Sequence, residues 1–237
     1  MILSEKHREF QARVREFAQK EVAPRAKELD KKEEFPWDLI KRMAELKLLG
    51  IFIPEEYGGA GLDTLCYAIA VEEVGRVCGS TGIFLAAHSS LGVFPIFQAG
   101  NEQQKRRWLI PLARGEKIGS FGLTEPNAGS DAAATQTTAK LEGDYYVING
   151  MKRFITSGSV ADIIVFTATQ DPSKGYRGIS AFVVEKGTPG FSYGKNEDKL
   201  GLRGSITSEL IFEDCKLPKE NLLGKEGEGF KVFMDTL

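Results

Sequence analysis

Apolar residues recur every three or four positions through the first half of the chain, which is the spacing of one face of an α-helix. Phe10, Val14 and Phe17 follow this spacing behind Ser4, a residue type that caps helix N-termini. A second helix is predicted from Phe35-Pro36, because proline suits the first turn of a helix, and Gly50 is a candidate for its end. The inner face of this second helix is predicted to consist of Leu39, Ile40, Met43 and Leu46.

A third helix is predicted from Asp63 or Thr64 to about Val77, and a long uncharged stretch follows it. No charged residue occurs between Val77 and Asn101, and this length is close to the ~20 residues of a membrane span. Four glycines, Pro95 and several polar side chains favour instead a pair of helices buried in a protein core, so no membrane span is expected.

The last helix of this half is predicted from a capping box. Asn101 is followed three residues later by Gln104, a pair in which each side chain bonds the backbone N–H of the other. The basic helix that begins there is expected to end near Arg114-Gly115.

The pattern changes near residue 116 to short β-rich runs. Gly143-Asp144 and Asn149-Gly150 separate three of these runs and favour two-residue hairpin turns, which need positive φ. Parallel β/α alternation is absent. The chain is therefore predicted to be α+β, with an all-α domain over residues 1–116 and an antiparallel β-barrel or sandwich over 117–215. The predicted strands cover 135–142, 145–148, 152–156, 163–169, 179–184 and 209–212.

Composition excludes several function classes. The 31 Lys and Arg residues are balanced by 33 Asp and Glu residues, whereas a protein that grips nucleic acid needs a basic excess. Three separated cysteines without a CxxC pair indicate a reducing compartment rather than a disulfide framework. The two histidines belong to no Cys/His cluster, so no metal site is expected, and the first residues lack the pattern of a signal or transit peptide.

Two glycine-containing loops are candidates for binding. Residues 59–64 (GAGLDT) imitate a dinucleotide-binding turn, but the third glycine is missing, and an irregular helix–helix loop is the better interpretation. Residues 121–131 (FGLTEPNAGSD) begin as a strand and turn tightly at Pro126. If Gly129 takes a positive φ, successive N–H groups could form an anion-binding nest, supplemented by the hydroxyls of Thr124 and Ser130. From these residues alone, a capped surface turn that binds nothing remains the alternative.

The segment FGLTEPNAGSD resembles the signature of the acyl-CoA dehydrogenase family, and further matches follow in the family's order. These are PEEYGGAGL and the helix after GNEQQK in the first half, and then ING-x-K-x-x-IT (148–156), TPG (188–190), KLGLRGS (199–205) and IFEDCKLPKENLLGKEGEGF (211–230). The resemblance covers essentially the whole chain and is strongest to short-chain, butyryl-CoA-like members.

The resemblance implies an N-terminal helical domain, a middle β-barrel that binds FAD, and a C-terminal four-helix bundle. Residues 216–237 would then be a linker and the start of that bundle, most of which lies outside this sequence. Three groups of residues would contact the cofactor. Phe121, Leu123 and Thr124 would line the flavin, Gly129 and Ser130 would approach the pyrophosphate with Ser130 also touching the acyl-CoA, and Phe154, Ile155 and Thr156 would flank the other edge of the ring.

Phe154 departs from many family members, which carry tryptophan there. Phenylalanine stacks but offers no indole N–H, and a plain barrel core residue is the alternative interpretation of Phe154.

In the family, a proton leaves Cα of an acyl thioester while the Cβ hydride passes to the flavin. The family's base is a glutamate of the C-terminal domain, so we assign no catalytic residue to this chain and expect it to be inactive by itself. Glu125, in the TEP turn, is interpreted as a structural carboxylate.

The resemblance further implies electron transfer to electron-transfer flavoprotein, a homotetramer, and a cytoplasmic location, or the mitochondrial matrix in a eukaryote. Glutaryl-CoA or branched-chain acyl-CoA dehydrogenation, and a non-catalytic binding or interaction module, are the alternatives.

Five other polar residues have open interpretations. Glu72 and Glu73 fit a solvated helix face or ion pairs, and His88 fits equally a satisfied buried histidine or a residue of the acyl pocket. Arg177 could meet a CoA phosphate but is better explained as an exposed loop residue. Glu197 resembles the family's acidic contact for electron-transfer flavoprotein, although a surface charge without a partner is the simpler interpretation.

Overall fold

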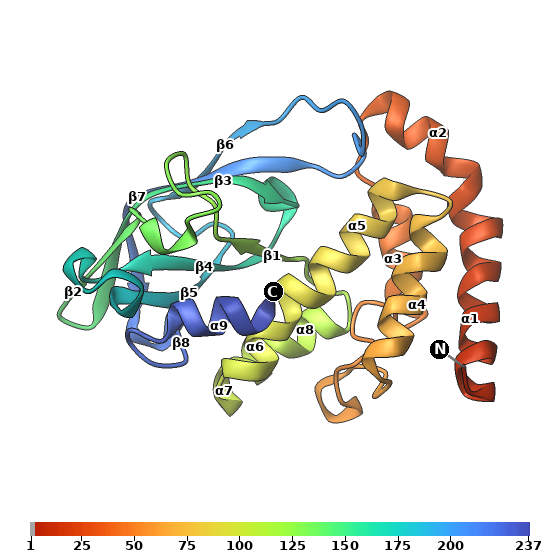
Figure 1. Cartoon of the computed structure of the whole chain (residues 1–237), viewed down its shortest axis with the longest axis horizontal. Helices are drawn as coiled ribbons and strands as arrows, with labels where there is room; N and C mark the ends of the chain where they lie inside the picture. Colours follow the sequence, from red (N-terminus) through yellow and green to blue (C-terminus); the bar gives the residue numbers. More distant parts are fainter. Residues whose placement is uncertain (1–2) are drawn as a thin grey trace.

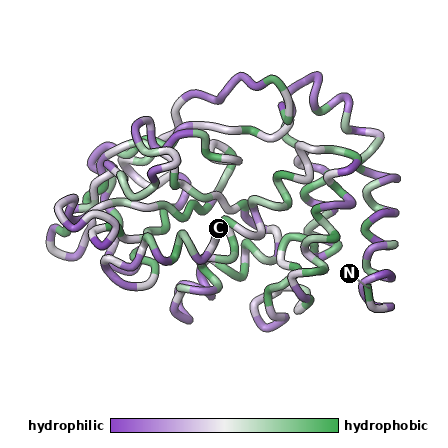
Figure 2. Tube along the Cα trace, in the orientation of Figure 1, coloured by the Kyte–Doolittle hydropathy of each residue, from purple (hydrophilic) through white to green (hydrophobic). Residues whose placement is uncertain are grey.

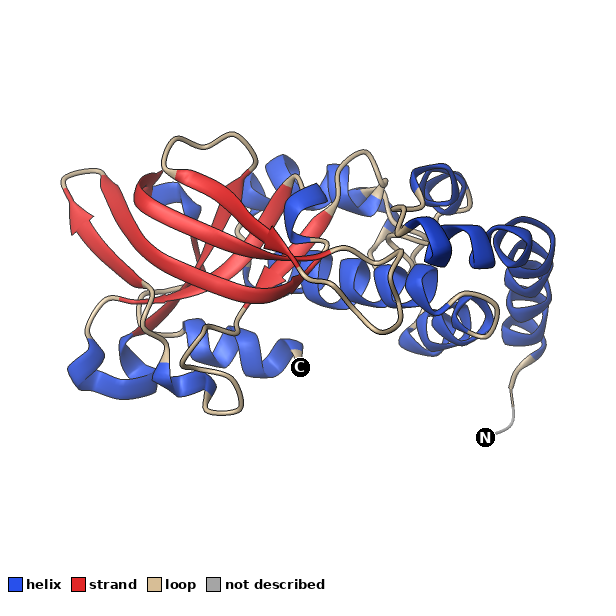
Figure 3. Ribbon diagram, turned by 90° about the horizontal axis from the view of Figure 1, so that it is seen from above, coloured by secondary structure: helices blue, strands red, loops and turns tan. Residues whose placement is uncertain are grey.

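The computed structural model describes residues 3–237, and helices and strands occupy separate parts of this chain (Figures 1 and 3). The described residues before Glu116 form helices only, and the first strand begins at Gly119, as the change in periodicity predicts. The α-helices are α1 (Glu5–Phe17), α2 (Ala23–Lys32), α3 (Trp37–Glu45), α4 (Thr64–Gly75), α5 (Gly79–Ala87), α6 (Phe94–Ala99), α7 (Glu102–Gln104), α8 (Ile110–Ala113) and α9 (Gly229–Thr236).

Three of these helices are entered through a wider π-helical turn, and each turn ends two residues before a proline. The π-helical segments are Ala18–Val22, His88–Val93 and Lys105–Leu109, and they lead into the helices that carry Pro24, Pro95 and Pro111. A proline ring clashes with the carbonyl four residues earlier and supplies no N–H. A π-turn widens the backbone at that point, so the helix continues past the proline instead of ending.

Because of the π-turn before Pro95, the prediction for the uncharged stretch is wrong. Residues Gly79–Ala99 form one continuous helix rather than an interrupted pair. The helix is long and apolar enough to cross a membrane, but 67% of its most apolar window is buried inside the fold. Figure 2 shows apolar residues running along it through the centre of the molecule, which supports the prediction of a core helix.

The predicted N-terminal caps are present. The side chains of Ser4 and Asp63 accept the N–H groups of His7 and Cys66, and Asn101 forms the capping box with Gln104. The predicted helix end at Gly50 is wrong, because α3 stops at Glu45 and the chain reverses at Lys47, whose φ is 56°.

Gly50 serves close packing instead. A Cβ there would lie 2.7 Å from the carbonyl oxygen of Ala113.

The strands form one curved eight-stranded sheet. Seven run in the order β6-β7-β3-β2-β4-β5-β8, and β1 pairs with β4. Most pairs are antiparallel as predicted, but β1 is parallel to β4, and β2 meets β4 in parallel at Thr138 and Thr169. The strands are β1 (Gly119–Gly122), β2 (Thr138–Glu142), β3 (Tyr145–Thr156), β4 (Ile163–Thr169), β5 (Ile179–Glu185), β6 (Phe191–Asn196), β7 (Thr207–Pro218) and β8 (Leu222–Leu223).

One of the two predicted hairpins is wrong. Gly143-Asp144 does connect β2 to β3, but Asn149-Gly150 lies inside β3, which continues from Tyr145 to Thr156. The ladder between β3 and β7 shifts register between Ile148 and Gly150. The dipeptide therefore forms a β-bulge, which uses the positive φ of glycine just as a hairpin turn does.

Two hydrophobic clusters of buried residues join the helical and β regions. The larger cluster extends from Val14 and Phe17 in α1, through Phe84 in α5, to Phe166 and Phe212 in the sheet. The connection between β6 and β7 reaches across to α2 (Figure 1), where Arg203 pairs with Asp30 at 3.0 Å. Helix α9 packs on β5 and α6, beneath the sheet in this view.

Candidate functional site

An open cleft lies where α5 and the following π-turn meet the ends of β1 and β3. Its volume is about 180 Å³. Six of the eight residues predicted to contact a flavin line it, namely Phe121, Leu123, Thr124, Phe154, Ile155 and Thr156. The fold thus brings together two segments that are about thirty positions apart in the sequence, and binding by these residues remains a prediction.

Phe154 owes its position to a second bulge in β3. The ladder with β7 shifts register between Lys152 and Ile155, so that Lys152 and Ile155 both point inward and Phe154 is turned out. Phe154 is 55% exposed and has a φ of 58°, which is unfavourable for a residue with a Cβ. The alternative of a barrel core residue is therefore wrong.

Strain of this kind is kept where the surrounding structure requires it, often at binding sites. The guanidinium of Arg153 lies 4.9 Å from the centre of the Phe154 ring and faces the carboxylates of Glu197 and Glu209. Glu197 therefore has a cationic neighbour, contrary to the simpler interpretation from the sequence.

The other walls of the cleft are apolar and firmly supported. Phe121 stacks on the fully buried Phe233 of α9, with ring centroids 4.0 Å apart. Ala87 and Leu91, one helical turn apart, complete the wall on the helical side.

Three hydroxyl side chains line the cleft among the described residues, and one of them is bonded internally, since Ser120 Oγ donates to the carbonyl oxygen of Thr156 at 2.6 Å. Within residues 3–237, the hydroxyls of Thr124 and Thr156 make no hydrogen bond to other protein groups, and neither does the N–H of Thr124. Thr124 and Thr156 are only half-buried, so these donors are accessible to a ligand.

Gly129 and Ser130 do not join the six cleft residues. Both are exposed beyond a turn that is closed by mutual backbone hydrogen bonds between Glu125 and Ala128. Gly129 does not have a positive φ, so the nest predicted around it is not formed in this conformation. A Cβ at Gly129 would meet nothing, which leaves open space on that side of the loop.

Behind the cleft lies an ion pair that is fully enclosed. Lys152 is 0% exposed and Glu125 4% exposed, and their Nζ and Oε1 atoms are 2.6 Å apart. Burial lowers the pKa of Lys152 to about 8, although Glu125 opposes that shift. Burial acts to raise the pKa of Glu125, but Lys152 and donated hydrogen bonds outweigh it and the pKa is lowered.

His88 is a satisfied buried histidine rather than a cleft residue. Its Nδ1 accepts the N–H of Gly119 at 3.1 Å, and its Nε2 donates to the carbonyl of Leu112 at 3.1 Å. This pattern defines the neutral tautomer, and burial lowers the pKa of His88 to about 4.

The structure also decides between the interpretations of Glu73 and Arg177. Glu73 is 2% exposed and pairs with Arg15 at 2.7 Å, so it is an ion-pair partner and not part of a solvated face. Arg177 is exposed and lies over the ring of Tyr176.

The sequence reasoning missed Ala87, Leu91, Ser120 and Leu237 in the cleft, and gave Lys152 no part in the site. The four-residue spacing of Ala87 and Leu91 marks one helix face, but many core positions share that spacing. A lysine at an inward position of an alternating strand is a better signal, because buried lysine requires a partner.

Comparison with known proteins now identifies the family. The profile of the acyl-CoA dehydrogenase N-terminal domain matches residues 4–116, and that of the middle domain matches residues 120–215. The chain belongs to the acyl-CoA dehydrogenase family. The short-chain specific acyl-CoA dehydrogenase of Clostridium acetobutylicum is 57% identical over 224 residues, which is 94% of this chain and 59% of that protein. The chain thus spans less than two thirds of the length of this relative.

Solved structures of acyl-CoA dehydrogenases superpose on the whole chain. Butyryl-CoA dehydrogenase from Megasphaera elsdenii is 46% identical, with a TM-score of 0.96, and the alignment covers 100% of this chain and 63% of that one. An acyl-CoA dehydrogenase from Bacillus anthracis, solved in complex with FAD, is 41% identical with a TM-score of 0.91, covering 99% of this chain and 40% of that one.

The residues of the cleft fit a flavin. Phe121, Leu123 and Phe154 offer apolar and aromatic surface to a ring system, and the unpaired donors of Thr124 and Thr156 suit the electron-rich polar edge of that ring. No Asp, Glu, Lys, Arg or His side chain lines the cleft among the described residues.

Proposed function

We propose that this chain forms the N-terminal and middle domains of an FAD-dependent acyl-CoA dehydrogenase that acts on short-chain acyl-CoA thioesters. The convergence of six predicted flavin contacts on one cleft supports the cofactor most directly. The 57% identity to a short-chain specific enzyme supports the substrate class.

Bound FAD supplies the hydride acceptor for forming the trans-2-enoyl thioester. Phe121, Leu123 and Phe154 exclude water from one face of the cleft, and Thr124 and Thr156 donate hydrogen bonds that favour added electron density on the ring. Gly129 and Ser130 bind the pyrophosphate, with Ser130 also reaching the acyl-CoA, once the exposed loop closes on the ligand. The base that removes the Cα proton comes from outside these 237 residues.

The proposal includes the partners of the complete enzyme. The complete enzyme passes its electrons to electron-transfer flavoprotein and assembles as a homotetramer, in the cytoplasm or in the matrix of a mitochondrion. The family resemblance supports these assignments.

The test begins with FAD binding to the chain, followed by flavin absorbance and by titration calorimetry. We expect saturable binding that weakens about tenfold when Thr124→Val and Thr156→Val are combined, because two donors to the ring are lost. A chain that binds no FAD, alone or within its complete protein, would favour the non-catalytic module. Activity of the complete protein on butyryl-CoA, glutaryl-CoA and branched acyl-CoA then separates the substrate alternatives.

A further inference from the structure

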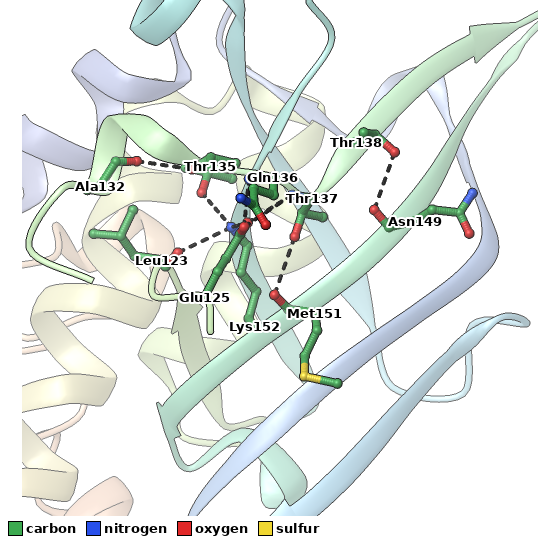
Figure 4. A network of polar contacts seen from close by, with 11 residues as sticks. Leu123, Glu125, Ala132, Thr135, Gln136, Thr137, Thr138, Asn149, Met151 and Lys152 are labelled. Carbon is green, nitrogen blue, oxygen red and sulfur yellow. Dashed lines mark hydrogen bonds and ion pairs between the residues drawn. The ribbon is translucent and has the colours of Figure 1, made fainter. Parts of the chain in front are cut away.

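The buried pair of Lys152 and Glu125 lies beside Leu123 (Figure 4), which precedes Thr124 in the wall of the cleft. Burying two charges gives little net stability, because the cost of removing both from water cancels most of their attraction. A pair of apolar residues would fill the same space as well. The pair is therefore better explained by what its geometry holds in place.

Lys152 holds the backbone just before Thr124 in the sequence. Its Nζ donates to the carbonyl oxygen of Leu123 at 3.2 Å, while Thr167 Oγ1 at 2.9 Å and Glu125 complete the environment of the ammonium. An ammonium has three N–H groups, so each of its donors has an acceptor.

Glu125 holds the backbone just after Thr124. Its carboxylate accepts the backbone N–H of Gln136 at 2.6 Å and that of Thr137 at 3.1 Å. The carbonyl of Thr124 itself accepts the N–H of Arg153 at 2.8 Å. The stretch from Leu123 to Glu125 is thus fixed to two other segments, β3 and residues 136–137.

These anchors determine where the N–H of Thr124 points. In a trans peptide the C=O and the following N–H point in opposite directions. Since the Leu123 carbonyl is directed at the buried ammonium, the Thr124 N–H is directed away from it, and Thr124 lines the cleft. That N–H has no acceptor among the described residues.

We propose that Lys152 and Glu125 are positioning residues, which act through the Leu123–Thr124 peptide to hold the Thr124 N–H and hydroxyl toward a bound flavin dinucleotide. This inference rests on the proposed function. A pKa of about 8 keeps the Lys152 ammonium mainly charged at neutral pH, and only the charged form has the three N–H groups needed for its three acceptors.

The test uses the double variant Lys152→Met with Glu125→Gln, which removes both charges together and leaves neither one unpaired. We expect its FAD dissociation constant to rise about tenfold, with the flavin absorbance of the bound form shifted, because the donor is no longer held in place. Independently of FAD, the backbone N–H of Arg153, which donates to the Thr124 carbonyl at 2.8 Å, should exchange with solvent deuterium about tenfold faster than in the unaltered chain.

Glu73→Gln is the matched control, because Glu73 is another buried carboxylate in an ion pair, but lies in α4 away from the cleft. It should lower the melting temperature and leave FAD affinity within about twofold. Should the double variant fail to fold, Glu125→Gln alone decides the matter, with an expected rise of about fivefold in the dissociation constant.

A folded double variant, or a folded Glu125→Gln variant, that binds FAD as the unaltered chain does and keeps the exchange rate of the Arg153 amide would overturn the inference. In that outcome the unaltered chain still binds FAD, so the proposed function stands. Failure of the unaltered chain to bind FAD would instead count against the proposed function.

Discussion

At the scale of single residues, His88 shows how burial converts an ordinary side chain into a pH-dependent element of stability. Its neutral ring bridges Gly119 and Leu112, and its pKa in the folded chain is about 4 instead of 6.5. Between pH 6.5 and pH 4, His88 is protonated in the unfolded chain but neutral in the folded chain. The free energy of unfolding therefore falls as the pH falls through this range.

This gives a first prediction. His88→Gln keeps an acceptor and a donor but cannot titrate, so it should be less stable than the unaltered chain at pH 7. The difference in free energy of unfolding between the unaltered chain and the variant should narrow by about 3 kcal/mol between pH 7 and pH 4. Urea unfolding at several pH values measures this difference. A difference that stays constant across this range would show that His88 is not held neutral.

Phe154 gives a second prediction at this scale, because it combines exposure with an unfavourable backbone conformation. Phe154→Gly should raise the free energy of unfolding by about 0.5–1 kcal/mol, since glycine tolerates a φ of 58° without a Cβ clash. FAD should bind about three- to tenfold more weakly, because the aromatic contact is lost.

Phe154→Ala is the control for this experiment. It removes the same ring but keeps the strain, so it should weaken FAD binding without the gain in stability. If both variants were equally stable, the positive φ would carry no cost.

At the scale of elements, β3 is the decisive strand, because its two bulges determine which side chains reach the cleft. The first bulge is permitted by Gly150, whose φ is 144° and whose Cβ would lie 2.6 Å from Thr137 Oγ1. The second turns Phe154 outward while Lys152 and Ile155 stay inside.

The third prediction concerns Gly150→Ala. It should lower the free energy of unfolding by about 2–3 kcal/mol, because the added methyl group collides with Thr137 in a backbone region that disfavours alanine. Gly143→Ala is the control, since that glycine also has a positive φ but open space around it, and it should cost about 1 kcal/mol. Equal denaturation midpoints for the two variants would contradict the close contact.

At the scale of the whole molecule, the helical region and the sheet pack through shared hydrophobic clusters and form the cleft between them. The site is therefore neither a property of the helices nor of the sheet alone. Its described lining offers aromatic surface and hydroxyl groups, but no side chain that could remove a proton at neutral pH.

The fourth prediction follows from that lining. The 237-residue chain with FAD, butyryl-CoA and an artificial electron acceptor should show no turnover above a control without protein, although it binds FAD. Proton abstraction needs a base within about 3 Å of the Cα proton, and the cleft residues supply none. Turnover at any acyl chain length would show that a base within these residues reaches the substrate.

Local features of this protein could be predicted from its sequence because neighbouring residues determine them. The Ser4 and Asp63 caps, the Asn101 capping box and the change from helix to strand depend on side chains within a few positions of one another. The family signature also indicated which residues would contact a flavin, and six of those eight meet in the cleft.

Long-range contacts decided the rest. Asn149-Gly150 favours a positive φ in a hairpin and in a bulge alike, and only pairing along β7 makes it a bulge. Whether Phe154 faces the core or the cleft depends on a register shift against the same strand. Lys152 can be buried only because Glu125, Thr167 and the Leu123 carbonyl converge on it from other segments, and no local pattern encodes the meeting of charges that are distant in sequence.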